Sequence, residues 1–534
     1  MAWSKGRGWF GFRSAVPGIA LLLMITFVGL GNASAATTHY ISKSVGSDSN
    51  NGTSKSTPWA HIPGMAGATS NAASYTPVAG DQFILYGGDT WGSADLGGVN
   101  LTYSGSSGSP IYIGVDQTWY TGSSWTRPIW NCQTTNCGDN SATFSNVVWL
   151  AGNYLTLDNI EITGYQCDDG GSIVATYGSN VIVENMYIHG WSRTGTCGQP
   201  GTNNPFAITM AWSNFTNEGQ GNEDLNNVID GSDSPNLDFM GGILHGNIVR
   251  GNVVRYVYDG MNGLFSIIDG NLVEYNYVSL SGDHCNMIYP QNTFPAGALG
   301  ANTIQISNNV VRHAGCSGGT TIFVLSNCQS GCNNTAKTAY LFNNVLYDNE
   351  VNSDKGFSIG GPGSNGKFYY YNNTVVTPSG YCMQNGSAGT GTAYYSNLHC
   401  ITSSSGPCNF VNGTCTSGGG NLLQSAAQAS VNISTHFDHY TASGTYAYTP
   451  VASTNSTVGA GTNYTSTGSF TCSTFPAMCS DSTYTTYNTT NHTAVSRTAN
   501  SRPSSGAWDI GGYQYNNGGN APPNPPTGLT IVVH

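Results

Sequence analysis

Short runs of alternating apolar and polar residues recur along this chain, each built around an asparagine flanked by β-branched or aromatic residues. One run reads LDNIEI at residues 157–162, and another reads VENMYI at residues 183–188. The asparagine returns at Asn159, Asn185, Asn252, Asn276, Asn309, Asn344, Asn373 and Asn397. Apart from the long gap after the second position, the steps are 26, 24, 33, 35, 29 and 24 residues. A repeat of this length, made of short strands, is typical of a solenoid whose coils would align the asparagine amides in a ladder.

Two neighbouring repeats superpose without a gap. Residues 244–263 read LHGNIVRGNVVRYVYDGMNG and residues 268–287 read IDGNLVEYNYVSLSGDHCNM, an offset of 24 throughout. The superposition pairs Asn247 with Asn271, Asn252 with Asn276, Asp259 with Asp283, and Asn262 with Asn286. In this register we expect paired residues to lie about 4.8 Å apart, the spacing of neighbouring strands.

Composition supports an all-β chain. Only 8% of the 534 residues are charged, and no stretch after residue 35 shows a sustained helical period. Disorder is disfavoured, because 39% of the residues are hydrophobic and 11% are aromatic. We therefore predict a solenoid whose repeats run from about residue 145 to about residue 405.

Residues 1–35 have the layout of a secretory signal peptide. Lys5, Arg7 and Arg13 form a basic start, residues 18–31 are apolar, and residues 33–35 read ASA, a small-residue cleavage site. The alternative is an uncleaved membrane anchor. Cleavage would remove three of the 15 basic residues and no acidic one, so the mature formal charge would be 12 − 27 = −15. That charge disfavours nucleic acid and anionic membranes as partners.

All 14 cysteines lie after the predicted signal, several of them in close pairs. The close pairs are Cys132 with Cys137, Cys328 with Cys332, Cys408 with Cys415, and Cys472 with Cys479. An even count in an exported protein predicts disulfides, above all Cys328–Cys332 and Cys472–Cys479. Metal binding by these cysteines is the alternative, and we predict no metal site from them.

Three segments depart from the repeat. Residues 192–238 are predicted to be an insertion, either on the binding face or as a solvated acidic loop. Its acidic residues are Glu218, Glu223, Asp224, Asp230, Asp233 and Asp238. Residues 425–500 are rich in Ser, Thr and Tyr and are expected to wrap or cap the last coils. Residues 516–534 form a Pro/Gly-rich tail.

Both ends of the mature chain carry recognisable phrases. Residues 80–88 read GDQFILYGG, and residues 508–513 read WDIGGY. These phrases resemble the opening and closing segments of secreted right-handed parallel β-helix proteins of the pectin-lyase-like superfamily. The resemblance implies a single-stranded right-handed parallel β-helix over residues 36–515, with loop insertions and a C-terminal capping region. It is specific for the fold and not for one activity.

The strongest candidate for chemistry is the stacked pair of Asp259 and Asp283. Two carboxylates at one strand spacing repel, so one pKa should rise and leave an acid beside a base or nucleophile. Glycoside hydrolysis needs such a pair. The same geometry also suits Ca²⁺, with Asn262 and Asn286 completing the oxygen ligands. A third possibility is that the Asp-Gly and Gly-Asp pairs simply form turns.

Residues 282–285 read GDHC, which resembles the Gly-Asp-Asp-Cys phrase of polygalacturonases. The resemblance matches Asp259 and Asp283 to two catalytic aspartates, whereas His284 replaces the third. His313 is a candidate for a later histidine of that family, but no Arg-x-Lys follows it. His284 and His313 are the best titratable partners nearby, although a stacked structural histidine is an equally open interpretation of His313.

Arg255 and Arg312 each follow a repeat asparagine by three residues. They are candidates for binding an acidic sugar, or for the base of an elimination, because guanidinium groups bind carboxylates bidentately. They could equally pair with Glu274 or with the acidic insertion. Asn262 and Asn286 are the remaining predicted substrate-binding residues.

These observations favour a secreted monomer that engages an extracellular polysaccharide and cleaves it as a hydrolase or lyase. We expect no required cofactor, with Ca²⁺ as an option, and no membrane association after signal cleavage. The competing hypothesis is a non-catalytic surface, adhesive or glycan-binding β-solenoid.

Overall fold

The computed structural model describes residues between 35 and 515, with gaps. The described ranges are 35–138, 146–168, 170–194, 197, 205–210, 221–237, 239–276, 286–292, 303–315, 322–325, 338–348, 356–360, 366–377, 380–385, 391–431, 448–450, 453–466 and 471–515. Residues from Ala36 onward form one compact unit. The predicted signal, apart from Ala35, and the tail lie outside the described residues.

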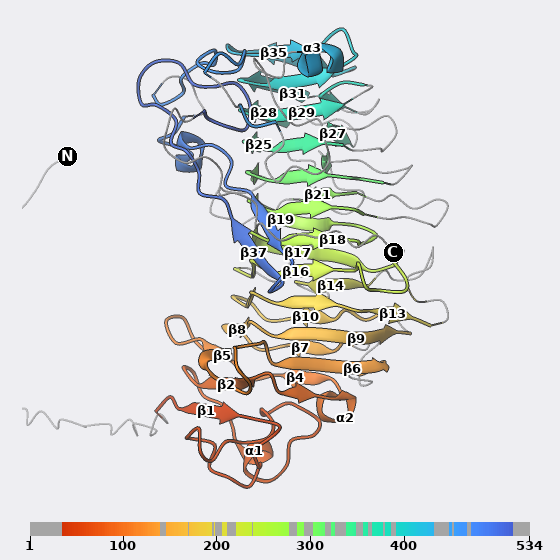
Figure 1. The fold of residues 1–534 in the computed structure, drawn as a ribbon, viewed down its shortest axis with the longest axis vertical. Helices are drawn as coiled ribbons and strands as arrows, with labels where there is room; N and C mark the ends of the chain where they lie inside the picture. The colour runs from red at the N-terminus through yellow and green to blue at the C-terminus, as the bar shows by residue number, and fades with distance from the viewer. Residues whose placement is uncertain are drawn as a thin grey trace, which may run out of the picture. The chain divides into compact units, whose positions relative to one another are not determined.

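The strands stack in three rows, which we call face 1, face 2 and face 3 (Figure 1). Face 1 contains β4 (Val99–Leu101), β7 (Val148–Leu150), β10 (Val174–Thr176), β14 (Phe206–Thr209), the first halves of β17 (Gly241–Arg250) and β19 (Met261–Asp269), β21 (Ile288–Asn292), β24 (Ile322–Leu325), β27 (Phe357–Gly360), β30 (Met383–Asn385) and β33 (Cys408–Asn409). Face 2 contains β1 (Thr38–Ile41), β2 (Gln82–Gly87), β5 (Ile111–Tyr120), β8 (Leu155–Asp158), β11 (Ile182–Glu184), β15 (Glu223–Leu225), the second halves of β17 and β19, β22 (Thr303–Ser307), β25 (Thr338–Phe342), β28 (Gly366–Tyr371), β31 (Gly391–Ser396) and β34 (Thr414–Ser417). Face 3 contains β3 (Thr90–Trp91), β6 (Ile129–Thr135), β9 (Glu161–Cys167), β12 (Tyr187–His189), β16 (Val228–Asp230), β18 (Val253–Arg255), β20 (Leu272–Glu274), β23 (Val310–Arg312), β26 (Val345–Tyr347), β29 (Thr374–Thr377), β32 (His399–Thr402) and β35 (Leu422–Gln424), with β13 (Ser192–Arg193) beside β9.

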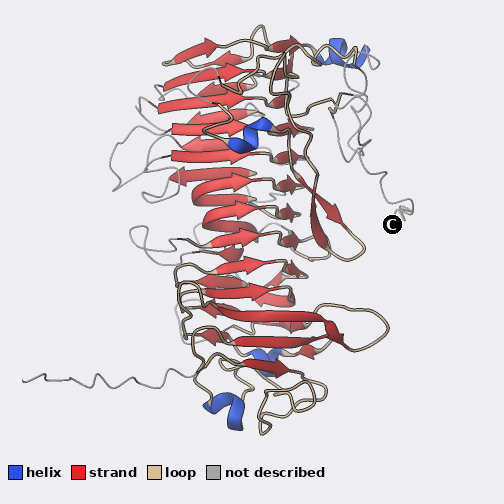
Figure 2. Cartoon of the chain, turned by 90° about the vertical axis from the view of Figure 1, so that its left-hand side faces the viewer, coloured by secondary structure: helices blue, strands red, loops and turns tan. Residues whose placement is uncertain are grey.

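Neighbouring strands within each face run parallel, as Figure 2 shows for the stacked arrows. Strands β17 and β19 continue from face 1 into face 2, so these two faces form one sheet, whereas face 3 is a separate sheet. Short parallel strands that repeat once per coil define a parallel β-helix. The predicted fold is therefore confirmed. Helices are few and short among the described residues: α1 (Ser70–Ser74), α2 (Ser93–Leu96), α3 (Ala426–Val431) and the 3₁₀ turn η1 (Pro476–Cys479).

Inward-pointing side chains from all three faces form one continuous apolar core that extends from Ile41 to Phe410. The alternation of side chains along each strand produces this core, because every second residue points inward. Not every inward position of face 2 is apolar. Asp224 occupies the place between Val183 and Val249 and is fully buried.

The asparagine repeat contains two adjacent rows rather than one. The first row adopts left-handed backbone with φ between 50° and 63°, at Asn159, Asn185, Asn226, Asn308, Asn343, Asn372 and Asn397. The second row is the buried ladder of Asn227, Asn252, Asn271, Asn309, Asn344 and Asn373, in which each backbone N–H donates to the Oδ1 of the next member at 2.8–3.1 Å. Asparagine suits both rows, since it tolerates left-handed φ and its amide satisfies buried backbone groups.

The predicted gapless superposition of residues 244–263 on 268–287 is wrong. Asn252 pairs with Asn271, an offset of 19, and not with Asn276. Asn262 pairs with Tyr289, an offset of 27, and not with Asn286. The offset changes within one coil because the connections between strands differ in length from coil to coil. A constant offset cannot describe such a helix.

The predicted insertion at 192–238 is also corrected, because it contains a complete coil. Strands β14, β15 and β16 lie within it and pair with the coils on either side. Glu223, Asp224 and Asp230 therefore lie in strands rather than in a loop. Glu218 and Asp238 lie outside the described residues.

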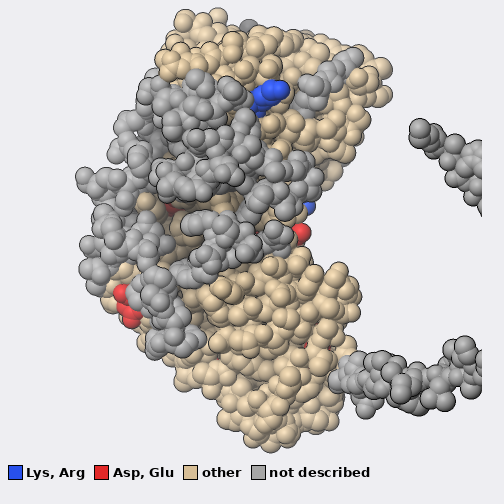
Figure 3. Space-filling view, turned by 180° about the vertical axis from the view of Figure 1, so that it is seen from behind, with Lys and Arg blue, Asp and Glu red and all other residues tan. Residues whose placement is uncertain are grey.

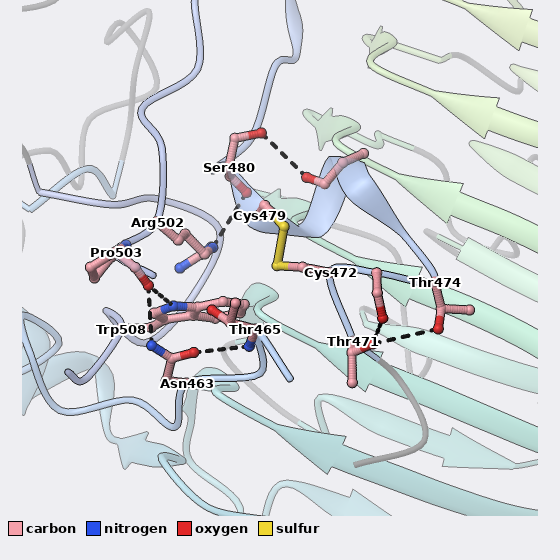
Figure 4. The surroundings of a disulfide bond; sticks show 12 residues. Asn463, Thr465, Thr471, Cys472, Thr474, Cys479, Ser480, Arg502, Pro503 and Trp508 are labelled. Atoms are coloured by element: carbon pink, nitrogen blue, oxygen red, sulfur yellow. Dashed lines mark hydrogen bonds between the residues drawn. A yellow bond between two sulfur atoms is a disulfide. The ribbon is translucent and has the colours of Figure 1, made fainter. Parts of the chain in front are cut away.

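The C-terminal residues 448–515, which we call the strap, run back along the sides of the coils. The backbone N–H of Thr462 donates to Asn397 Oδ1 at 2.7 Å, whereas Arg127 near the start of the helix donates to the backbone carbonyl of Asn491 at 2.8 Å. Figure 4 shows part of the strap, where the Cys472–Cys479 disulfide lies near Trp508 and Arg502. The segment predicted to wrap or cap thus wraps the helix, while α3 packs on β32 and β35 of the last coils.

Five disulfides join the described cysteines: Cys132–Cys137, Cys167–Cys197, Cys382–Cys400, Cys408–Cys415 and Cys472–Cys479. Three predicted close pairs are confirmed, among them Cys472–Cys479. The predicted Cys328–Cys332 bond lies outside the described residues. Within the described part of the chain, no helix is long and apolar enough to cross a membrane. Charged side chains are sparse among the described residues of the surface in Figure 3.

Candidate functional site

Asp259 lies in the turn that connects β18 on face 3 to β19 on face 1. Its side chain is only 2% exposed. Asn262 donates from Nδ2 to Asp259 Oδ2 at 2.5 Å, and the backbone N–H of Asn286 donates to Asp259 Oδ1 at 3.0 Å. The carboxyl is therefore held by two neutral donors, one from its own turn and one from the next coil.

Burial raises the pKa of Asp259 to about 7, although the hydrogen bonds from Asn262 and Asn286 oppose the rise. A carboxyl with such a pKa gains and loses a proton close to neutral pH, as a general acid or base must. The pKa of Asp259 is raised, but no neighbouring carboxylate contributes to the rise as the sequence predicted. The cause is desolvation.

Asp283 and His284 lie outside the described residues, so the proposed carboxylate pair stays a prediction. Asn286 is described, and it lies beside Asp259 through its backbone rather than opposite Asn262. The superposition that motivated the Asp259–Asp283 pair does not hold in the flanking strands. Two of the predicted residues, Asn262 and Asn286, are nevertheless brought together around Asp259.

Next to this turn, face 1 presents an outward row of residues one strand apart. From Asn262 the row continues to Tyr289 in one direction and to Leu244 in the other. Beyond Leu244 it reaches the small side chains of Thr209 and Ala175 and then Trp149. The Trp149 ring stacks on Tyr177 with centroids 6.0 Å apart, and Tyr177 is 49% exposed. An aromatic pair and the Asp259 turn thus lie along the same face.

Arg255 and Arg312 belong to a different structure on face 3. Arg255 Nε lies 3.1 Å from Glu274 Oε1, and Arg312 Nε lies 2.7 Å from Glu274 Oε2. Arg255 also approaches Asp230 at 3.6 Å, and Arg312 donates to the Tyr347 hydroxyl at 2.8 Å. The strap covers this row, with the Tyr487 ring centroid 5.0 Å from the Arg255 guanidinium. Of the two interpretations left open by the sequence, these contacts favour structural pairing with Glu274.

His313 lies at the end of face 3 in a column of stacked rings. Its ring lies 4.5 Å from that of Tyr275, which lies 4.9 Å from that of Tyr256. Its Nδ1 lies 2.7 Å from Asp348 Oδ2. These contacts favour the stacked structural histidine that the sequence left open.

The sequence analysis missed a second pair of acidic residues. Asp158 and Glu184 are direct neighbours in face 2, and Tyr112 and Asn185 donate to the Asp158 carboxylate at 2.6 and 2.7 Å. Burial and then the charges of Asp158 and Glu223 raise the pKa of Glu184. The signal was present, since an acidic residue precedes the asparagine in both LDNIEI and VENMYI, 26 residues apart.

A metal ion has limited support within the described ranges, where no three His, Cys, Asp or Glu side chains are grouped to hold one. The Asp259 carboxylate and the amide oxygens of Asn262 and Asn286 are the donors that Ca²⁺ would use here. The fit is partial, because Asn262 directs its NH₂ group at Asp259.

No protein-family model matches this chain, and no curated protein matches it. Several solved structures do. A pectate lyase is 15% identical and covers 91% of this chain and 98% of its own, with a TM-score of 0.45. A rhamnogalacturonan lyase is 15% identical over 68% of this chain and 87% of its own, with a TM-score of 0.39. A lacto-N-biosidase from Eubacterium ramulus is 13% identical over 73% of this chain and 68% of its own, with a TM-score of 0.35.

Proposed function

We propose that this protein is exported and cleaves an extracellular polysaccharide at the turn that carries Asp259. The observation that carries the proposal is a buried carboxyl whose pKa lies at about 7, next to the outward row of face 1. The five disulfides among the described residues fit an oxidising compartment. The end phrases that resemble secreted β-helix proteins support the same setting.

In this proposal Asp259 donates a proton to the oxygen of the scissile glycosidic bond. A protonated carboxylic acid with a raised pKa performs this step in glycoside hydrolysis, and a second carboxylate acts as base or nucleophile. Asp283 remains our candidate for the second group. Because Asp259 is buried, the substrate has to approach along Asn262 and Tyr289, which are only half-buried.

The aromatic pair at the other end of the row is proposed to bind sugar. Tyr177 offers an exposed ring, and aromatic faces pack against the apolar faces of sugars. From Trp149 to Asn262 the row spans four strand steps, about 19 Å. Thr209 and Ala175 in the middle of the row are buried, so the sugar contact proposed here is confined to the exposed aromatic end.

An elimination mechanism with Arg255 or Arg312 as base is less well supported, since both guanidinium groups are bound to Glu274. A bound cation remains an alternative role for Asp259, in which Ca²⁺ would neutralise an acidic sugar.

The test is a polysaccharide panel incubated with purified mature protein, with reducing ends and the absorbance of unsaturated uronates both recorded. Asp259→Asn should lower turnover at least about 100-fold, the usual contribution of acid–base catalysis. Asp116→Asn is the matched control, since Asp116 is a surface residue paired with Lys55. Loss of activity with chelator in the wild type would favour the cation. If Glu184→Gln loses activity and Asp259→Asn does not, the active site would instead lie at the Asp158–Glu184 pair.

The competing class is a non-catalytic glycan-binding solenoid. The hydrogen bonds around Asp259 would also occur in an ordinary turn, and this favours the non-catalytic class. Binding to a polysaccharide without any cleavage product, unchanged by Asp259→Asn, would support that function instead.

A further inference from the structure

Strands β17 and β19 turn the corner between face 1 and face 2 without leaving the sheet. At this corner Leu244 pairs with Asn262 and Gly246 pairs with Phe265, so the register shifts by one residue. His245 in β17 thus stands opposite two residues of β19, Gly263 and Leu264. This arrangement is a β-bulge, which bends a strand and re-aims the side chains beside it.

The His245 side chain occupies the inside of this bulge. It is 8% exposed, and its Nδ1 accepts a hydrogen bond from the backbone N–H of Leu264 at 2.9 Å. Gly263 has φ +111°, and a Cβ atom placed on it would lie 2.3 Å from His245 Nδ1. The imidazole therefore takes the space that a side chain at residue 263 would need, and it requires glycine there.

This bulge begins next to Asn262, the residue whose side chain is hydrogen-bonded to Asp259. Asn262 directly precedes Gly263, and its Nδ2 donates to Asp259 Oδ2. His245 accepts from the N–H of Leu264 and its ring lies against Gly263, so it fixes the peptide that joins these two residues, next but one after Asn262 in the chain. A continuous series of contacts thus links the imidazole to the carboxyl.

We propose that His245 is a positioning residue, which holds the Asn262 amide against Asp259 by anchoring the bulge of β19. Its importance for catalysis rests on the proposed function, whereas its effect on the Asp259 carboxyl does not. Burial lowers the pKa of His245 to about 4, so the ring is neutral through the pH range in which Asp259 titrates. A neutral ring that accepts at Nδ1 carries its proton at Nε2.

Ionisation of Asp259 can be measured without any substrate. The difference in melting temperature between the wild type and Asp259→Asn should grow as pH rises from about 4 and level off where folded Asp259 becomes ionised. We take the pH at which it levels off as the Asp259 midpoint. His245→Phe keeps a ring but removes the acceptor. In its background the Asn262 hydrogen bond should weaken, and the midpoint of this pH dependence should rise by about one unit, the worth of one charge-assisted hydrogen bond.

His245→Gln, whose Oε1 can accept from Leu264, should restore most of the wild-type midpoint. His399→Phe is the matched control for loss of a buried imidazole on another face, and it should leave the midpoint unchanged. If the proposed function also holds, His245→Phe should lower kcat about 10-fold with little change in KM. An inactive panel would refute the proposed function while leaving the midpoint measurement valid.

A direct measurement on the wild type decides the case even if His245→Phe does not fold. Histidine ¹⁵N chemical shifts should show His245 as a neutral ring protonated at Nε2. A ring protonated at Nδ1, or an unchanged Asp259 midpoint in folded His245→Phe, would overturn the proposal.

Discussion

Two places in this helix bury carboxyl groups, and their neighbours balance the charge in opposite ways. On face 3, Asp230, Arg255, Glu274 and Arg312 alternate in sign, so each charge has an opposite neighbour one strand away. At the turn before β19, the hydrogen-bond donors to Asp259 are neutral, among them the Asn262 amide and the backbone N–H groups of Asn286 and Gly260. At this second site, burial raises the pKa of the carboxyl to about 7.

The difference teaches that burial by itself does not create a functional acid in this fold. An ion pair offsets the loss of hydration and keeps a carboxylate charged, whereas amide donors offset it only in part. The strap adds to the contrast, because Tyr487 covers the charged row of face 3. A buried carboxyl without a cationic neighbour is the better marker of chemistry here.

The largest expected effect comes from breaking the charged row. Glu274→Gln would leave Arg255 and Arg312 facing each other beneath the strap, and Glu274 is 3% exposed. We expect a loss of about 3–5 kcal/mol in the free energy of unfolding, typical of a buried pair that loses one partner. Urea denaturation at pH 7 measures it. Asp116→Asn breaks an exposed pair and should cost at most about 1 kcal/mol. Equal losses in both variants would contradict the comparison.

Asp224 sharpens the comparison, because this inward carboxyl has neither an ion pair nor a hydrogen bond among the described residues. Burial raises its pKa well above the usual value. Its neutral form is therefore favoured in the folded state, and the associated stability is present at low pH and is lost as pH rises above about 4. Asp224→Val should stabilise the protein by about 1–3 kcal/mol at pH 7 and by less at pH 4. Thermal melts at both values test this, and a destabilised variant would refute it.

Asp259→Asn should show the same sign. The folded pKa of about 7 lies above the usual value of 3.8, so stability contributed by protonation is complete below about pH 4 and is lost as pH rises to 7. The mutant should gain about 2–3 kcal/mol relative to the wild type between pH 5 and pH 8, since its amide never ionises. A pH-independent difference would mean that Asp259 does not titrate in this range.

The smallest effect is expected at His492, between the two antiparallel strands of the strap, β36 (Thr485–Asn488) and β37 (Thr493–Ser496). The His492 ring stacks on Tyr187 with centroids 4.2 Å apart, and burial and then the charge of His189 lower the pKa of His492. The neutral ring is favoured in the folded state, so stability should fall as pH drops below about 6.5. His492→Phe keeps the stack and should remove this acid sensitivity. His492→Ala should cost about 0.5–1.5 kcal/mol at pH 8. Limited proteolysis of the strap at pH 5 and pH 8 reports both changes.

Local patterns were enough to predict much of the fold. Alternation around each asparagine predicted strands, and the repeat length predicted stacked coils, because both depend on neighbours within a few residues. The close cysteine pairs were predictable for the same reason. Asp259 was also singled out from sequence, as one member of the superposed pair with Asp283.

The register and pairing of strands between coils could be read only from the folded structure. The offset between coils is 19 at Asn252 and 38 at Asn271, because each coil adds connections of its own length. A single superposition therefore mispaired Asn252 and Asn262. The acid pair of Asp158 and Glu184 was visible in the sequence as two similar runs, but its meaning required knowing that both side chains leave the same face.

Contacts between segments that are far apart in the chain could not be predicted from the sequence. Arg127 contacts Asn491 across 364 residues, and the partners of Arg255 come from the two neighbouring coils and the strap. Whether a charged side chain is paired or left with neutral donors depends on which surfaces the chain brings together. Local composition sets the strands of this protein, while the environment that gives Asp259 its proton affinity arises only when the coils and their turns are packed.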